Sequence, residues 1–134
     1  MIQPLVVSWP NTRDAFYELI DGQTFAGQTV AAYYRLQADF TNRLPAALIS
    51  QSGGTITQSV SRQDRLRIDV YAPGTQADTV AQAICFLLTS RWHMTTAGRI
   101  DRVVVEATPN DVPYADPTIA LSSAVYRASI RPLR

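Results

Sequence analysis

The stretch from Asp64 to Met94 constrains the fold most, because it joins a strand pattern directly to a helix pattern. In residues 65–72 every even-numbered residue is apolar, whereas three of the four odd-numbered residues are charged. A period of two is typical of a strand that buries one face and exposes the other to solvent. Pro73 and Gly74 then interrupt the pattern, so we expect a tight turn after the strand.

A helix is predicted directly after this turn. Thr75 and Asp78 stand three residues apart, so we expect a capping box that satisfies amide groups of the first helical turn. Apolar residues then recur at steps of three and four, which predicts one apolar stripe along the helix. The stripe comprises Ala77, Val80, Ala81, Ile84, Leu87, Leu88 and Trp92. Such a helix would cover the buried face of the preceding strand.

Other elements are predicted on both sides of this unit. A helix begins near Asn11 and runs to Ile20, and residues 55–65 belong to a long polar hairpin. Residues 22–44 fit a strand or a short helix, and paired tyrosines there favour extended structure. Strands are predicted at 45–51, 99–108 and 119–131, with loops at 95–98 and 110–117.

These elements predict an α+β fold in a single domain that spans residues 1–134. We expect a mixed or antiparallel sheet of about four to five strands, packed by two main helices. The order is helix, strands, helix, two strands, with a hairpin that protrudes beyond the core.

Composition narrows the possible partners. The chain has 134 residues, 46% hydrophobic content and a formal net charge of +1. Such a balance is typical of a globular protein, and it gives no long-range field that would attract nucleic acid or an anionic membrane. No apolar run reaches the roughly 18 residues that span a bilayer, and the first residues do not form a signal peptide. We therefore expect no membrane partner.

No catalytic, cofactor-binding or metal-binding residue is predicted. His93 is the one histidine and Cys85 the one cysteine, so a two-histidine metal motif cannot form. A serine triad would need His93, and the sequence has no GxSxG motif to supply the nucleophile. The nucleotide-binding glycine motifs are absent as well. Asp69 and Glu106 fall on outward strand positions, where we expect solvated carboxylates. The sequence thus predicts a protein that is not an enzyme and needs no cofactor.

All twelve basic residues are arginine. Those in the predicted hairpin and strands leave two interpretations open. They form either a scattered solvated face or a set that pairs with acidic residues of a neighbouring copy. These residues are Arg62, Arg65, Arg67, Arg99, Arg102, Arg127 and Arg131.

Several segments together resemble the tail terminator, or tail completion, proteins of long-tailed bacteriophages, particularly those of actinobacterial hosts. The likeness covers roughly residues 10–133. It is carried by the helix that ends at Ile20, by 44–49 leading into Gly53 and Gly54, by 64–72 leading into an alanine-rich helix, and by 112–117 before the closing strand 124–130.

This resemblance implies a virion protein that forms a hexameric ring at the head-proximal end of the tail tube. The ring would stop tube polymerisation and offer a docking surface to the head connector. Its partners would be copies of itself, the major tail tube protein and a head-completion or connector protein. DNA would pass through the pore without specific binding. The protein would assemble in the host bacterial cytoplasm and reside in the neck of the virion.

The two protruding segments are the expected sites of assembly. We predict contacts to neighbouring copies or connector proteins through Arg62 and Asp64 in the hairpin, and through Asp111, Tyr114 and Asp116 in the loop before the last strand. Two alternatives remain. The chain could be a head-completion, connector-stopper or tail tube subunit of the same machine, or it could be a small ligand-binding or enzymatic α+β domain.

Overall fold

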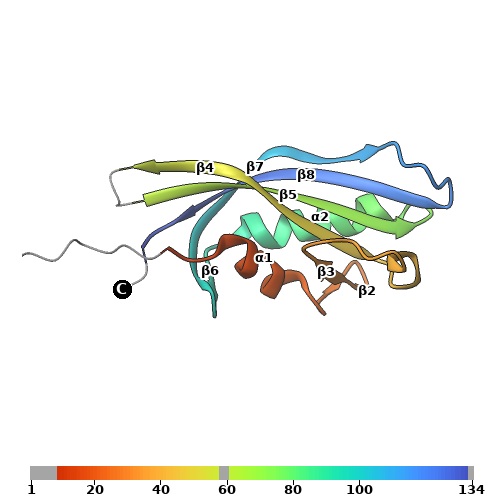
Figure 1. The fold of residues 1–134 in the computed structure, drawn as a ribbon, viewed down its shortest axis with the longest axis horizontal. Coiled ribbons are helices and arrows are strands. Elements are labelled where there is room, and N and C mark those ends of the chain that lie inside the picture. The colour runs from red at the N-terminus through yellow and green to blue at the C-terminus, as the bar shows by residue number, and fades with distance from the viewer. Residues whose placement is uncertain (1–8, 58–60, 133–134) are drawn as a thin grey trace, which may run out of the picture.

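The computed structural model describes residues 9–57 and 61–132. Figure 1 shows long strands that run nearly the whole length of the molecule, with two helices packed along them. The elements are α1 (Thr12–Ile20), β1 (Thr24–Phe25), β2 (Gln28–Thr29), β3 (Ala31–Tyr33), the 3-10 helix η1 (Phe40–Asn42), β4 (Ala46–Thr57), β5 (Ser61–Pro73), α2 (Gln76–Ser90), β6 (His93–Thr95), β7 (Gly98–Val112) and β8 (Ile119–Ile130).

The predicted α+β fold is confirmed, with more strands than expected. The main sheet has six strands in the order β3-β4-β5-β8-β7-β6, and β1 and β2 form a separate two-stranded sheet. The β3–β4 pair is parallel and the other pairs are antiparallel, so the main sheet is mixed. The additional strands have two or three residues each, too few for a period of two to be visible in the sequence.

The strand β5 and the helix α2 form as predicted and pack together, but the start and the end of α2 differ from the prediction. Leu66, Ile68 and Val70 are buried against the helices. The capping box is wrong: Thr75 makes no capping hydrogen bond through its side chain. The Asp78 carboxylate instead accepts a hydrogen bond from the Ser122 hydroxyl of β8 at 3.4 Å. The Asp78 side chain, which the local spacing assigned to the helix cap, therefore bonds to a residue of a distant strand instead.

Both helices lie on the same face of the main sheet, which we call the covered face. Alternate residues of β5 and β8 join α1 and α2 in one large core cluster, in which Phe16 of α1 meets Tyr126 of β8 edge to face. On the opposite face, which we call the open face, no helix of the described residues packs on the centre of the sheet. At one end the open face carries a smaller apolar cluster built around Ala46, Tyr71 and Leu121.

Two local predictions need correction. Asp111 was expected in a loop, yet it lies in β7 and pairs with Ser122, because the ladder with β8 continues through Val112. Asp69 was expected to be solvated, but it is buried and accepts a hydrogen bond from Arg67 Nε at 2.9 Å. In residues 22–44 the extended interpretation holds for β1, β2 and β3, and a turn of 3-10 helix follows.

Candidate functional site

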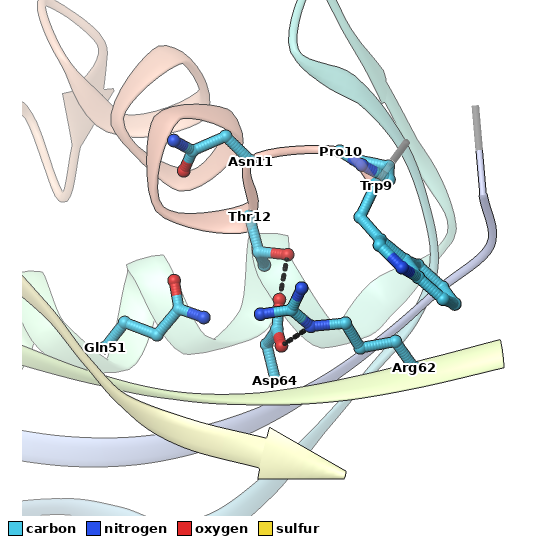
Figure 2. A pocket seen from close by; sticks show the side chains of 7 residues that line it. All are labelled: Trp9, Pro10, Asn11, Thr12, Gln51, Arg62 and Asp64. Carbon is cyan, nitrogen blue, oxygen red and sulfur yellow. Dashed lines mark hydrogen bonds and ion pairs between the residues drawn. The ribbon is translucent and has the colours of Figure 1, made fainter. Parts of the chain in front are cut away.

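Arg62 and Asp64 lie where β5 passes the start of α1 (Figure 2). The Asp64 carboxylate accepts a hydrogen bond from the Thr12 hydroxyl at 2.7 Å and another from Arg62 Nε at 2.6 Å. Trp9 packs beside this pair, with the Arg62 guanidinium 6.0 Å from the centre of its ring. The cluster lines an open cavity of about 260 Å³ that is also lined by Pro10, Asn11 and Gln51.

Local structure explains why these groups meet. Asn11 caps α1 by accepting a hydrogen bond from the Asp14 amide at 3.1 Å, which fixes the first turn and places Thr12 towards the sheet. The even-numbered residues of β5 face the helices, so Asp64 points to Thr12. At 1% exposure, Asp64 is an internal acceptor that holds Arg62 in place and cannot itself reach a partner. Arg62 is the accessible member of the predicted pair.

The chemistry of this cavity favours polar contact over catalysis or tight anion binding. One carboxylate balances the one guanidinium at 2.6 Å, so the pair offers little net charge to an ion. The amides of Asn11 and Gln51 can donate or accept hydrogen bonds. The volume is below the usual range for a drug-sized ligand. The arrangement suits a single polar side chain or a few water molecules.

Tyr114 and Asp116 lie in the connection between β7 and β8. The Tyr114 ring packs edge to face against Tyr71 and Phe40, with ring centres 5.4 and 6.5 Å apart, so it closes the small apolar cluster of the open face. Asp116 accepts hydrogen bonds from the Thr118 hydroxyl at 2.7 Å and the Thr118 amide at 2.9 Å. These bonds lower the pKa of Asp116 and shape the turn.

The structure separates the five predicted assembly residues into two groups. Because β5 pairs with β8 in antiparallel register, the β4–β5 hairpin and the β7–β8 connection project from opposite ends of the long axis (Figure 1). The hairpin end carries Arg62 and Asp64, whereas the other end carries Asp111, Tyr114 and Asp116. The tip of the hairpin, residues 58–60, lies outside the described residues.

Most sheet arginines are already paired within the chain. Arg65 and Arg127 oppose each other on β5 and β8, and the Glu106 carboxylate lies between them and pairs with both. The Asp101 carboxylate likewise pairs with Arg131 at 2.6 Å and Arg99 at 3.0 Å. Hydrogen bonds from Arg131 are the main reason that the pKa of Asp101 lies below its usual value. The open face is therefore a network of ion pairs rather than a set of isolated charges.

Sequence reasoning missed a group of exposed apolar residues. Phe86 is 77% exposed because it lies on the side of α2 away from Ile84 and Leu88, which face the sheet. Trp92 was assigned to the buried stripe, but α2 ends at Ser90 and leaves it 51% exposed under the Arg99 guanidinium. Phe86 was visible in the sequence as an apolar residue outside the stripe. The early end of α2 had no comparable signal.

His93 has a structural role at the end of α2. Its Nε2 lies 3.1 Å from the Leu88 carbonyl oxygen at the end of α2, and the ring is buried. Among the described residues, no three histidine, cysteine or acidic side chains gather as a metal site would require.

Comparison with known proteins adds no family assignment. No protein-family model matches the chain. No curated protein matches it either. In the part of the chain that the structure describes, neither helix has the length and apolar character needed to cross a membrane.

Proposed function

We propose that this chain is a structural subunit of the tail terminator ring of a long-tailed bacteriophage. Six copies close around a pore at the head-proximal end of the tail tube, stop its growth and offer a docking surface to the head connector. The proposal builds on the sequence resemblance between residues 10–133 and that family.

The elongated sheet with two different projecting ends is the observation that best supports this function. A protein that joins a tube to a connector needs two distinct surfaces along one axis. The β4–β5 hairpin supplies one end and the β7–β8 connection supplies the other (Figure 1). A ring also needs sides that bind a neighbour, and in a ring the two contacting surfaces differ from each other.

The two ends differ in chemistry, which fits two different partners. The hairpin end presents the Arg62 guanidinium beside Trp9. The other end presents Asp111, which is exposed, and Tyr114, whose ring is held by Tyr71. Aromatic and arginine side chains are enriched at protein interfaces. We assign these ends to the tube and the connector, without assigning which end meets which.

A connector-stopper and a tube subunit are the nearest alternative functions, because both also assemble as rings. A tube subunit would polymerise by itself, whereas a terminator would form at most one ring and would shorten tubes made by another protein. The assembly behaviour of the purified chain therefore separates these functions.

The test is assembly of tail tubes from the major tail tube protein encoded in the same genome, with and without this chain. Tube lengths are measured by electron microscopy. We expect shorter tubes that carry added density at one end. A variant in which Thr57–Ser61 is replaced by Asn-Gly keeps the Ile56–Arg62 strand pair and shortens the hairpin, so it should cap tubes less well. Unchanged tube lengths with the wild-type chain would contradict the proposal.

A further inference from the structure

The open face and the outer surface of α1 carry opposite surplus charge. Along the centre of the open face, four arginines accompany two carboxylates, and register with neighbouring strands places all six on that face. These residues are Arg65, Arg67, Arg102 and Arg127, with Asp69 and Glu106. The surplus is positive even though most of these charges are paired within the chain.

Arg102 is the most available of these cations. It is exposed on β7, and no ion pair joins it to another described residue. It lines a shallow hollow of about 260 Å³ together with Gln63, Val104, Glu106, Arg127 and Ser129. Val104 is 42% exposed, so this hollow has an apolar residue within a basic rim.

The outer surface of α1 has the opposite character. Asp14 and Glu18 are exposed and stand four residues apart, so they are neighbours on one side of the helix, and Asp21 follows in the next turn. All three accept hydrogen bonds from neutral donors: the Tyr34 hydroxyl, the Thr96 amide and hydroxyl, and the Ala32 amide. None of the three forms an ion pair with a described residue.

Arg13 is the one cation of α1. It does not lie beside the acidic side chains, so the outer surface of α1 keeps a surplus of negative charge. The Arg13 guanidinium donates to the Ile49 carbonyl at 3.2 Å and the Tyr34 carbonyl at 2.9 Å, so it is held against the sheet rather than beside the carboxylates. Because α1 packs on the covered face, its acidic surface and the basic open face point in opposite directions from the sheet.

We propose that the open face around Arg102 and Val104 binds the acidic outer surface of α1 from a second copy of this chain. Charge complementarity selects the second copy as the occupant, since one chain carries both matching surfaces. The contact is head to tail, and repetition of such a contact gives a closed ring or an open filament. The inference rests on the proposed function only in expecting a ring.

The test measures self-association of the full chain by sedimentation at 50 and 500 mM NaCl. We expect association at low salt that weakens at high salt, because exposed charges are screened. Arg102→Glu should weaken association at least about fivefold. Asp14→Arg should do the same, and the double variant should recover most of the loss. Arg43→Glu makes the same charge change as Arg102→Glu on the β3–β4 connection, outside both surfaces, so it should leave association unchanged.

The outcomes separate this inference from the proposed function. A chain that stays monomeric at low salt, or an Arg102→Glu variant that associates like the wild type, would overturn the inference. If such a chain still shortens tail tubes, the proposed function stands with other surfaces between copies. If Arg102→Glu weakens association and the wild type leaves tubes unchanged, the contact stands and the function fails. Circular dichroism confirms that each variant is folded, and failure of the double variant to recover would also overturn the pairing.

Discussion

At the residue scale, Asp64 is the polar group whose removal should lower the free energy of unfolding most. It is almost fully buried, and its two acceptor bonds join the start of α1 to β5. Removal of a charged partner from such a site costs about 1.5–3 kcal/mol. We predict that Asp64→Ala lowers the free energy of unfolding by about 2 kcal/mol in urea denaturation.

Neighbouring substitutions provide the controls. Gln63→Ala alters an exposed residue on the open face and should change the free energy of unfolding by less than about 0.5 kcal/mol. Thr12→Val removes one donor to Asp64, so its effect should largely disappear when Asp64 is already alanine. If Asp64→Ala changed the free energy of unfolding as little as Gln63→Ala, the Thr12–Asp64–Arg62 cluster would contribute nothing to stability.

Asp101 makes the stability of the fold depend on pH in the acid range. Its pKa in the folded chain is lowered, first by hydrogen bonds from Arg131, so the folded state favours the ionised form more than the unfolded state does. This stabilisation is present above the unfolded pKa and is lost as pH falls through the folded pKa. We predict that Asp101→Asn lowers the melting temperature at pH 6 and that the difference from wild type shrinks below about pH 4.

Melting curves measured from pH 6 to pH 2.5 check this prediction. Arg131→Gln removes the cation that pairs with Asp101. In this variant the melting temperature should depend less on pH over the same acid range. A difference that stays constant across the whole range would contradict the assigned role of Asp101.

The identity of these polar partners was beyond sequence reasoning. Asp64 and Asp78 were expected to be exposed or to serve local roles, but each carboxylate accepts a hydrogen bond from a distant element, from Thr12 of α1 and from Ser122 of β8 respectively. Thr12 and Asp64 are 52 positions apart, and nothing in either segment alone indicates that they meet. Local patterns report which side of a strand a residue occupies and not what covers that side.

At the element scale, α2 shows a clear contrast between its two sides. Ile84 is buried against the sheet, whereas Phe86 is the most exposed large apolar residue of the described chain. We predict that Ile84→Ala lowers the free energy of unfolding by about 2–4 kcal/mol, since it removes buried methylene groups and leaves a cavity. Phe86→Ala should change it by less than about 0.5 kcal/mol.

Urea denaturation of the two variants side by side checks this contrast. Both substitutions lie in the same helix and both end in alanine, so the effect of helix propensity is small beside the expected difference in burial. If Phe86→Ala were as destabilising as Ile84→Ala, the assignment of the sheet-facing side of α2 would be wrong.

Long periodic elements were predictable and short ones were not. The alternation in β5 and the stripe of α2 place Leu66, Ile68, Ile84 and Leu88 in the core, as the structure shows. By contrast, β6 has three residues, and its pairing with β7 ends α2 two residues before Trp92. Such pairing depends on a distant strand, so the sequence of the helix could not indicate it.

At the scale of the whole molecule, the sheet separates the surfaces that the sequence grouped together. Pattern alone identified two projecting segments, but it gave no relative placement. The antiparallel register of β5 with β8 puts them at opposite ends, where they suit two different partners. In the proposed ring, the broad faces between these ends would bind neighbouring copies, through the basic open face of one copy and the acidic outer surface of α1 of the next.

The most direct test of the proposed function is electron microscopy of tail tube ends in the presence of the purified chain. We predict one closed ring of six copies with a central pore at a single end of each tube, and tubes that stop growing once the ring is present. Tubes whose two ends both lack added density, and whose lengths match those formed without the chain, would contradict the account.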